Sequence, residues 1–429
     1  MAIYKSYLIL AVALLSSNAH ASGFEKAVMW SGKYAGAAGA GAAGGVSGSQ
    51  SLYFNPAGLA SAGDVSLNYS PTWINVDGSL VTATRVDQSR PGVLPFGGGF
   101  VSYGSGPWGF GMGAYLAGGE KAIYPNVDLT PISNSFTTYT PTLETDLVIV
   151  EYSIGGAYEV MPGLKFGAAW RISKATGTLS SILETTTNTA FSHIVIRDAK
   201  DTRYNGFRLG AMYEDPANFR WGVGASYRSK VTFDAPGTGT GETIVIPAPV
   251  NSVTAQNVAD TRIGVSLPAA YSVGGHYAVN DSFKLLAGID YVKYSVDDQV
   301  YIIGTANGVT IPNIALNWSD EWNWRLGVEY SGIHALKLRA GYVRTSQVTN
   351  TTNAKATLAP PAGGNTFTIG AGYSVMANLD IDGAFEYAHA SGDGSMTMPT
   401  SSLKELLAGV TTTTKANVYG VHTGVTYRF

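Results

Sequence analysis

Few residue patterns in this sequence could do chemistry, and the first is a glycine motif. Gly39-Ala-Gly41-Ala-Ala-Gly44 has the spacing of a dinucleotide-binding fingerprint, in which the glycines let the backbone approach a pyrophosphate. That chemistry also needs a strand before the motif and a parallel strand-helix unit around it, and neither pattern is present. We interpret these glycines as positions of close packing, and we expect no cofactor.

The histidines and paired acids predict neither a metal site nor an enzyme. No Gly-x-Ser-x-Gly occurs, and Asp297-Asp298 lie in a polar link, where neighbouring acids are more often solvated than catalytic. The histidines lack ligand spacing such as His-x-x-x-His; they are His20, His193, His276, His334, His389 and His422. A Ser–His pair assembled across distant strands is the remaining enzymatic alternative.

The composition points to a membrane protein without long apolar helices. The chain is 45% hydrophobic, with 25 Tyr, 8 Trp and 53 Gly, and only 13% of it is charged. Soluble domains average about 25% charged residues. The absence of cysteine excludes disulfides and Cys-ligated metals, and a net charge of −3 gives no basic surface for nucleic acid.

The first 21 residues have the three regions of a cleaved signal peptide. Lys5 is followed by an apolar run from Tyr7 to Leu15 and by the small-x-small site Ala19-His20-Ala21. A single-pass anchor is the alternative, but the run is far shorter than the roughly 20 residues that a spanning helix needs. Export and composition together predict a protein of the bacterial outer membrane.

Fourteen stretches of alternating apolar and polar residues predict barrel strands. In the last nine residues, VHTGVTYRF, one face is mostly apolar and the other is mostly polar, as in a strand between lipid and a polar lumen. The stretches lie at about 64–77, 93–104, 107–117, 145–160, 163–179, 202–215, 218–233, 269–280, 282–296, 321–332, 335–348, 365–377, 379–391 and 415–429. The terminal Phe429 resembles the strand signature that barrel-assembly machinery reads, and we expect that machinery as a partner.

The links between these strands alternate in length. Short turns, such as Met161-Pro-Gly163, alternate with long polar links at 78–92, 118–144, 180–201, 234–268, 297–320, 349–364 and 392–414. Outer-membrane barrels pair short periplasmic turns with long outer loops. The sequence therefore predicts an all-β fold, a 14-stranded antiparallel transmembrane β-barrel over residues 64–429, with both termini at the short-turn side.

Residues 22–63 precede the first strand and do not alternate. Their Gly and Ser content would suit a flexible tail, but a solvated linker tends to lack large groups such as Phe24, Trp30 and Tyr53. A barrel of this size encloses more space than its own side chains fill. We therefore expect residues 22–63 to form a hatch, or plug, inside the lumen.

Several of these residues carry a family resemblance. The start Ser22-Gly-Phe24, the Gly/Ala-rich stretch, Asn55-Pro56-Ala57 and the strands at 322–342 and 365–390 resemble the FadL/TodX family of outer-membrane transporters for hydrophobic molecules. The resemblance implies uptake of long-chain fatty acids by capture at outer loops, passage through an internal apolar pocket and lateral exit into the membrane. Uptake of aromatic or aliphatic hydrocarbons by the same route is the runner-up. A general diffusion porin and a structural or adhesive barrel are further alternatives.

The resemblance also assigns roles to particular residues. It places Phe24 in the ligand pocket and makes Asn55, Pro56 and Ala57 part of the hatch, where Pro56 fixes φ and biases Asn55 to an extended conformation. It implies a kinked third strand beside the exit, and Gly109, Gly111 and Gly113 would weaken and bend that strand.

The inward-facing residues do not decide whether the ligand is charged or neutral. A fatty acid needs a cationic partner for its head group, and the candidates are Arg171, Arg208, Arg325, Lys337 and Arg339. Inward acids could instead neutralise them; these are Asp290, Glu329, Asp382 and Glu386. We expect a monomer whose partners are the hydrophobic ligand and outer-membrane lipid.

Overall fold

The structure is a computed structural model, and it describes the chain from residue 31 onward. The described ranges are 31–61, 63–78, 87–89, 92–127, 139–186, 190–245, 252–351, 353, 357–358, 362–395, 404–405 and 411–429. The predicted signal peptide (1–21) and Phe24 lie outside these ranges. Within them, no helix has the length and apolar character needed to cross a membrane.

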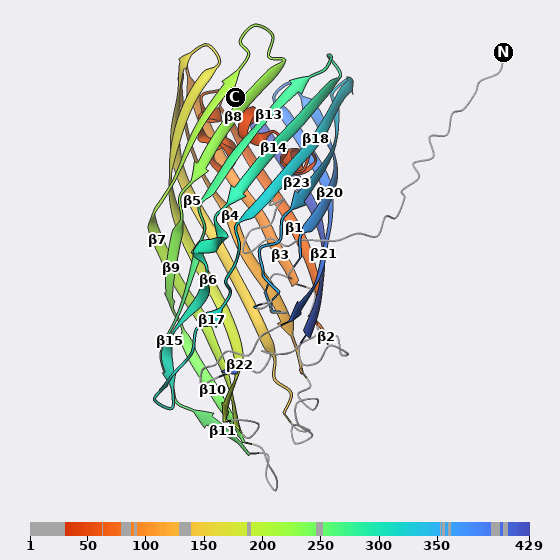
Figure 1. Cartoon of the computed structure of the whole chain (residues 1–429). Coiled ribbons are helices and arrows are strands. Elements are labelled where there is room, and N and C mark those ends of the chain that lie inside the picture. The colour runs from red at the N-terminus through yellow and green to blue at the C-terminus, as the bar shows by residue number, and fades with distance from the viewer. Residues whose placement is uncertain are drawn as a thin grey trace, which may run out of the picture.

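Fourteen antiparallel strands close into a barrel, as predicted (Figure 1). Each strand pairs with the next, and β1 also pairs with β23, which closes the cylinder. The strands are β1 (Asp64–Gly78), β3 (Gly92–Ser105), β4 (Trp108–Tyr124), β5 (Leu143–Met161), β6 (Leu164–Thr186), β7 (Ala190–Glu214), β8 (Trp221–Arg228), β13 (Ala270–Ala278), β14 (Phe283–Val292), β18 (Glu321–Ile333), β19 (Leu336–Thr345), β20 (Gly364–Met376), β21 (Leu379–Ser395) and β23 (Thr411–Arg428).

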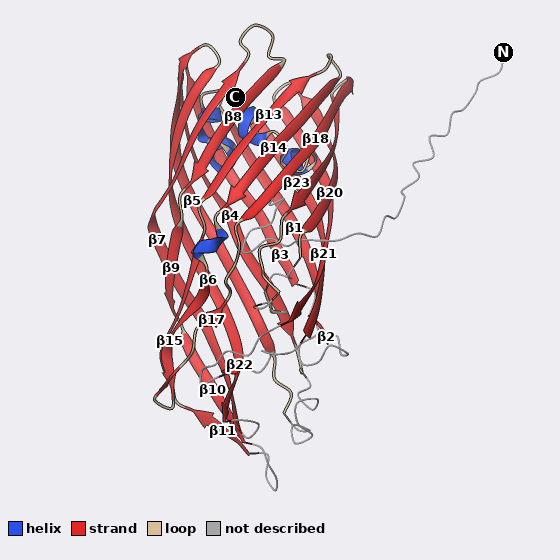
Figure 2. Ribbon diagram, in the orientation of Figure 1, coloured by secondary structure: helices blue, strands red, loops and turns tan. Residues whose placement is uncertain are grey.

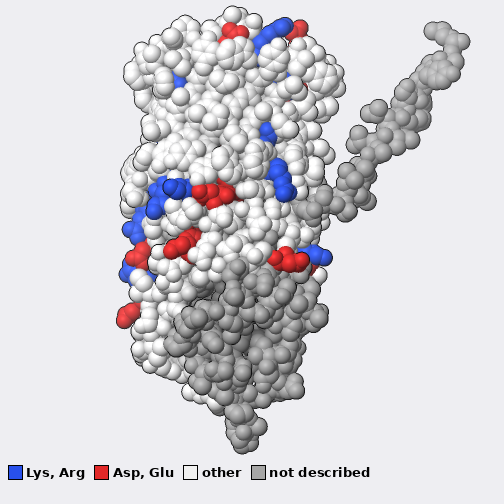
Figure 3. Space-filling model, viewed as in Figure 1, with Lys and Arg blue, Asp and Glu red and all other residues white. Residues whose placement is uncertain are grey.

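The outward faces of the strands form an apolar zone bordered by aromatic residues. On β13, Tyr271 and Tyr277 are exposed near the two ends of the strand, with Val273 exposed between them. Figure 3 shows a zone almost free of charge, between charged side chains at the short-turn end and a band of charged side chains at mid-height. Tyr and Trp at the edges of such a zone are typical of membrane interfaces. The zone therefore marks the part of the barrel that lies in lipid.

A second, smaller sheet continues three barrel strands beyond this zone. It contains β9 (Val231–Pro236), β12 (Val258–Leu267), β15 (Gln299–Ala306) and β16 (Val309–Thr310), and β17 (Ile314–Ala315) pairs with β15. Its order β9, β12, β15 repeats the barrel order β8, β13, β14. The three strands therefore bend together, at Ser229-Lys230, at Pro268-Ala269 and at the 3-10 helix η3 (Tyr294–Val296).

Three details of the predicted strand map are wrong here. The link predicted at 180–201 is mostly strand, because β6 runs to Thr186 and β7 begins at Ala190. The single strand predicted at 218–233 is two strands, β8 and β9, in different sheets. The links at 234–268 and 297–320, predicted as loops, contain the other strands of the second sheet. Four further strands extend the barrel sheet at the long-loop end: β2 (Asp87–Gln88), β10 (Thr238–Val245), β11 (Ser252–Gln256) and β22 (Lys404–Glu405).

Residues 31–61, here called the N-terminal segment, lie inside the barrel. The segment contains α1 (Gly32–Ala35), α2 (Ala42–Gly45), α3 (Ser51–Phe54) and the 3-10 helix η1 (Pro56–Leu59), drawn in blue among the strands in Figure 2. Helix α1 contacts β20, β21 and β23, α2 contacts β7, β8 and β13, and η1 contacts β4, β5, β6 and β7. A segment that touches strands around the whole circumference occupies the lumen.

Glycine makes this close fit to the wall possible. A Cβ on Gly44 would lie 2.2 Å from the carbonyl oxygen of Gly274, and one on Gly41 would lie 2.6 Å from that of Gly275. Gly41 also has a φ of 70°, which residues with a side chain rarely adopt. These contacts between backbones explain the fingerprint-like glycine motif as packing.

Candidate ligand site inside the barrel

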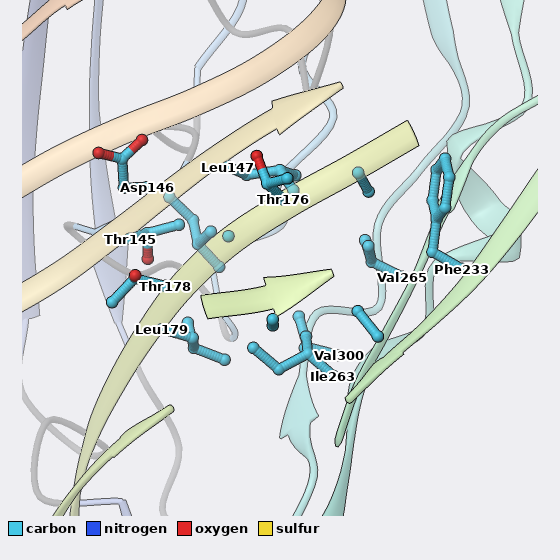
Figure 4. A pocket seen from close by; sticks show the side chains of 15 residues that line it. Thr145, Asp146, Leu147, Thr176, Thr178, Leu179, Phe233, Ile263, Val265 and Val300 are labelled. Atoms are coloured by element: carbon cyan, nitrogen blue, oxygen red, sulfur yellow. The ribbon is translucent and has the colours of Figure 1, made fainter. Parts of the chain in front are cut away.

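An apolar pocket lies between the barrel wall and the second sheet (Figure 4). Leu147 of β5 and Leu179 of β6 line one side, and Phe233, Val265 and Val300 of β9, β12 and β15 line the other. Ligand pockets are mostly apolar, and this lining is almost entirely apolar. The bend that forms the second sheet therefore creates a site for an apolar molecule at the long-loop end.

The apolar lining continues from this pocket toward the N-terminal segment. One cluster of buried apolar side chains includes Leu179 and Phe233 of the pocket, Phe100 and Tyr115 of the wall, and Leu52 of α3. Tyr53 packs against the same cluster. An apolar ligand that moved along this cluster would not have to expose its surface to water, which costs about 0.8 kcal/mol for each CH₂ group.

Arg208 lies beside this route and makes no close ion pair within the described part of the chain. It projects from β7, is only 6% exposed, and forms no ion pair with any residue that the structure describes. Its Nε has no hydrogen-bond partner, and its guanidinium lies 5.2 Å from the centre of the Tyr53 ring. A buried cation is normally paired, because desolvating its charge is costly. Arg208 therefore offers a preformed contact to an anionic group in the lumen.

Arg171, next to Arg208 in the wall, has its charge neutralised by Glu151. Both side chains are fully buried, and the Arg171 Nε donates to Glu151 Oε2 at 3.1 Å, while the second ion-pair contact joins Nη2 to Oε1. Arg171 Nη1 also donates to the Ser229 carbonyl at 3.0 Å. These contacts hold the strands together where β8 ends, so Arg171 has less capacity for a ligand than Arg208.

Arg325 and Arg339 lie elsewhere, against the N-terminal segment. Arg325 pairs with Asp290 at 2.6 Å and donates to the carbonyl of Ala38 at 2.8 Å. Arg339 pairs with both Glu329 (2.7 Å) and Asp382 (2.6 Å). The structure thus separates the predicted ligand-binding arginines into Arg171 and Arg208 on one side and Arg325 and Arg339 on the other. Phe24, the remaining predicted contact, is outside the described residues.

Asn55-Pro56-Ala57 joins the N-terminal segment to the wall formed by β6, β7 and β8. The Asn55 Nδ2 donates to the carbonyls of Ala43 (2.5 Å), Ala211 (3.1 Å) and Ala225 (3.2 Å). Its Oδ1 accepts from the Ala57 N–H at 3.1 Å and caps η1, with Pro56 at the first helical position. One amide side chain therefore ties two parts of the segment to two barrel strands.

The glycines of β4 receive the end of the segment. A Cβ on Gly109 would lie 1.8 Å from the Leu59 carbonyl oxygen, and one on Gly111 would lie 2.8 Å from Leu59 Cδ2. A Cβ on Gly113 would lie 2.4 Å from Cδ1 of the Phe100 ring. Pairing with β3 and β5 is regular through all three glycines, and the irregularity in β4 comes later, between Leu116 and Gly118. Their observed role is to make room for neighbouring groups.

The barrel wall has a seam between β3 and β4. The ladder between them ends at Gly98 and Tyr115, although β3 stays paired with β1 as far as Gly92, and β4 stays paired with β5 as far as Tyr124. Residues 92–97 and 116–124 therefore face one another without a described ladder. The seam begins at the depth of Tyr69, an exposed residue of β1 in the lipid zone.

Aromatic rings fill the inner side of the closed end of the seam. Tyr115 stacks on Phe100 with ring centres 5.5 Å apart, and Tyr53 meets Tyr115 edge-on at 5.2 Å. The Tyr115 hydroxyl donates to Glu151 Oε2 at 2.9 Å. Arg208 therefore contacts Tyr53, Tyr53 contacts Tyr115, and Tyr115 is hydrogen-bonded to Glu151 in the wall. Sequence reasoning missed Phe100, Tyr115 and Glu151, because only the strand register brings them together.

One titratable group at the edge of the second sheet has an unusual environment. Asp297 follows η3, is 2% exposed, and accepts from the Ser266 N–H at 3.0 Å. Burial raises the pKa of the Asp297 carboxyl to about 7, although the Ser266 hydrogen bonds and the charge of Lys230 act in the opposite direction. Asp297 therefore changes charge near neutral pH.

Comparison with known proteins agrees with this architecture. Residues 12–429 match the family model described as "Outer membrane protein transport protein (OMPP1/FadL/TodX)". None of the curated proteins matches the sequence. Among solved structures, a Pseudomonas aeruginosa FadL homologue has a TM-score of 0.72 at 16% identity, covering 95% of this chain and 100% of its own. The P. putida toluene transporter TodX gives 0.71 at 16% identity, with 94% and 99% covered. The Ralstonia pickettii toluene transporter TbuX gives 0.61 at 17% identity, with 95% and 99% covered. At these identities the structural likeness establishes the fold alone.

Proposed function

Because the chain belongs to the FadL/TodX family of outer-membrane transport proteins, we propose that its ligands are long-chain fatty acids. The family assignment makes the protein an outer-membrane transporter of hydrophobic compounds. The choice of fatty acids among such compounds rests mainly on one observation. Arg208 is a buried cation beside an apolar route, and it forms no close ion pair with a described residue. A molecule with a long apolar tail and a carboxylate matches both features.

Capture would begin at the long-loop end, in the pocket between β5, β6 and the second sheet. The pocket lining, which includes Leu147, Phe233 and Val265, accepts an apolar tail. The ligand then moves along the apolar cluster until its carboxylate meets the Arg208 guanidinium. Arg171, Arg325 and Arg339 were candidates for the same role, but each is already paired with a carboxylate. We therefore assign the head group to Arg208 first. Phe24 stays a proposed pocket contact.

Exit would be lateral, through the seam between β3 and β4. The seam opens where the wall lies in lipid, and apolar side chains line the lumen up to Tyr115. In this proposal a carboxylate at Arg208 competes with the Tyr53 ring for the guanidinium. When Tyr53 is displaced, its contact with Tyr115 is lost. The N-terminal segment then shifts at its anchor, Asn55-Pro56-Ala57. Gly109, Gly111 and Gly113 act in gating by receiving the segment rather than by bending the strand.

Uptake of aromatic or aliphatic hydrocarbons is the second candidate function. The apolar pocket would accept such molecules, which need no cationic partner. TodX and TbuX are described as toluene transporters, and similarity at 16% and 17% identity carries the fold rather than the ligand. The state of Arg208 favours the fatty acid, because a neutral hydrocarbon would leave that buried charge uncompensated.

A binding experiment with matched ligands tests the proposal. Palmitate, hexadecanol and toluene would be titrated into the purified full-length protein in a non-ionic detergent. A charge-assisted hydrogen bond contributes about 1.5–3 kcal/mol, so palmitate should bind at least about tenfold more tightly than hexadecanol. Equal affinity for the two long-chain ligands would refute the head-group assignment. Tighter binding of toluene than of palmitate would favour the hydrocarbon transporter.

A further inference from the structure

A continuous row of aromatic side chains crosses the outward face of five adjacent barrel strands. Phe207, Tyr227, Tyr271, Tyr291 and Trp322 belong to β7, β8, β13, β14 and β18. Neighbouring ring centres are 5.8, 4.9, 6.0 and 4.7 Å apart. From Tyr227 to Trp322, each residue is the direct cross-strand partner of the next. We call these five residues the aromatic row.

The aromatic row lies at the long-loop edge of the lipid zone. Tyr227 and Tyr291 are among the last residues of β8 and β14 before the strands bend into the second sheet. The Tyr291 hydroxyl donates to Asp320 Oδ2, which fixes that ring from the loop side. Aromatic residues with one polar edge are suited to the head-group level of a membrane. The row therefore faces the head groups of the outer leaflet.

Two exposed lysines lie just beyond the aromatic row. Lys230 follows Tyr227 by three residues, and Lys293 follows Tyr291 by two. Both flank the Pro268-Ala269 bend, because Arg228 pairs with Ala270 and the Lys293 N–H donates to the Ala269 carbonyl at 2.9 Å. Neither ammonium group forms an ion pair with a residue in the described ranges.

Other cations in this region are used differently. Arg203 pairs with Asp201 at 2.6 Å, Arg262 with Asp234 at 2.6 Å, and Arg197 with Glu144 at 3.2 Å. The charge of Lys230 acts on Asp297 and that of Lys293 acts on Asp320, but neither acid lies within ion-pair distance of the ammonium group. Asp297 is buried and accepts from the Ser266 N–H. Asp320 accepts from Tyr291 and from the Ser295 N–H. Lys230 and Lys293 are thus two cations on either side of one bend, and neither forms a close ion pair with a described carboxylate.

We propose that the aromatic row, together with Lys230 and Lys293, binds a phosphorylated glycolipid of the outer leaflet. The phosphate group would lie between the two ammonium groups, which attract phosphate as point charges. The sugar rings would pack on the aromatic row, and the acyl chains would run along the apolar wall below it. This surface points outward, so the proposal does not depend on which ligand crosses the lumen.

The same face would also suit a second copy of the chain, but the lysines argue against that partner. In an interface related by two-fold symmetry, the same patch meets itself, and the lysines of one copy would approach those of the other. Like charges brought together in this way oppose such a contact. A phosphate-bearing lipid supplies the missing negative charge and leaves the aromatic row in its membrane environment.

The test compares phosphorylated and dephosphorylated glycolipid on matched variants. The full chain would be reconstituted with phosphatidylcholine vesicles containing a bisphosphorylated disaccharide glycolipid, and retained glycolipid would be counted by native mass spectrometry. The variant is Lys230→Gln with Lys293→Gln. The control is Arg344→Gln with Lys415→Gln, which removes two exposed cations on strands outside the aromatic row. A second variant, Lys230→Arg with Lys293→Arg, keeps the charge.

The expected result is loss of retention in the Gln variant alone. Each lysine near a charged lipid surface contributes about 1 kcal/mol, so affinity should fall roughly tenfold to thirtyfold. The control and the Arg variant should stay within about twofold of the wild type, and the dephosphorylated glycolipid should not distinguish the variants. Equal loss in the control, unchanged retention in the Gln variant, or equal retention of phosphatidylglycerol would each overturn the proposal. A dimer that dissociates in the Gln variant would make the surface a subunit interface instead.

Discussion

The Arg208 guanidinium lies 5.2 Å from the centre of the Tyr53 ring, so a cation of the barrel wall and an aromatic residue of the N-terminal segment share one contact in the lumen. Tyr53 also meets Tyr115 at the closed end of the seam between β3 and β4. The same ring therefore touches the proposed head-group site and the proposed exit.

Replacing Arg208 should separate charged from neutral ligands. In Arg208→Gln the head group loses a charge-assisted contact, so palmitate affinity should fall about tenfold to a hundredfold, while hexadecanol affinity should stay unchanged. Titration of both ligands into the purified variant measures this difference. Arg220→Gln, at an exposed short-turn position, is the control and should leave both affinities unchanged. A parallel loss for the alcohol would show that Arg208 supports the fold of the pocket rather than the carboxylate.

Asn55→Asp should loosen the N-terminal segment. The substitution removes the donor to the carbonyls of Ala43, Ala211 and Ala225, and each buried acceptor left without a donor costs about 1–3 kcal/mol. The segment should open more often, which should speed tryptic cleavage after Lys33, a residue inside the lumen. Fragment sequencing over time measures the rate. Asn218→Asp, in an exposed turn, should behave as the wild type. Equal cleavage rates in all three proteins would contradict the anchoring role of Asn55.

Gly109→Ala should displace the end of the segment rather than alter the strand. The added Cβ would lie 1.8 Å from the Leu59 carbonyl oxygen, which is backbone and cannot turn aside. Displacement should open a path through the lumen, and we expect higher conductance in planar bilayers. Gly99→Ala is the matched control, because its Cβ would meet only the flexible Leu67 side chain at 3.3 Å. Conductance equal to that of Gly99→Ala would count against the packing role of Gly109.

Asp297 should make the second sheet sensitive to pH. Burial raises its pKa to about 7 from the ordinary value of 3.8, so the folded state binds the proton more tightly than the unfolded state. That stabilisation is complete below about pH 3.8, declines as the pH rises, and is lost above about pH 7. The contribution of this proton to the free energy of unfolding is at most about 4 kcal/mol, since one pKa unit corresponds to 1.36 kcal/mol.

Asp297→Asn removes this dependence. Hydrogen exchange at the Ser266 amide, corrected for the intrinsic effect of pH, should show protection falling between pH 5 and 8 in the wild type and constant protection in the variant. A wild-type profile as flat as that of the variant would mean that Asp297 is ionised throughout this range.

The barrel could be predicted from the sequence because lipid imposes a pattern on every strand. In 283–291, Phe283, Leu285 and Tyr291 face lipid and Lys284 and Asp290 face the lumen, as the alternation required. The second sheet could not be predicted in this way. Strands β9, β12 and β15 pack against another sheet outside the lipid zone, so no lipid-facing stripe marks them. Length alone suggested loops, and only the pairing of β12 with β9 and β15 reveals the sheet.

The candidate site was predictable in residue type but not in pairing. Inward arginines were evident from alternation, but whether each is neutralised depends on diagonal and neighbouring positions across strands. Arg325 reaches Asp290 although its direct cross-strand partner is Gly288. Arg208 is distinguished from Arg171 only by the position of Glu151, which the sequence does not give. Register, and not composition, therefore decides which cation is available to a ligand.

The position of the N-terminal segment has a consequence for biogenesis. The segment directly precedes β1, and β1 is the strand that seals against β23. The segment contacts strands from β4 to β23, and its glycines fit the wall too closely for later threading through a finished cylinder. We therefore expect the segment to be in place inside the barrel when β1 docks on β23. A bulky domain fused immediately before residue 31 would have to remain outside at that moment, so such a fusion should stall maturation at the final strand junction.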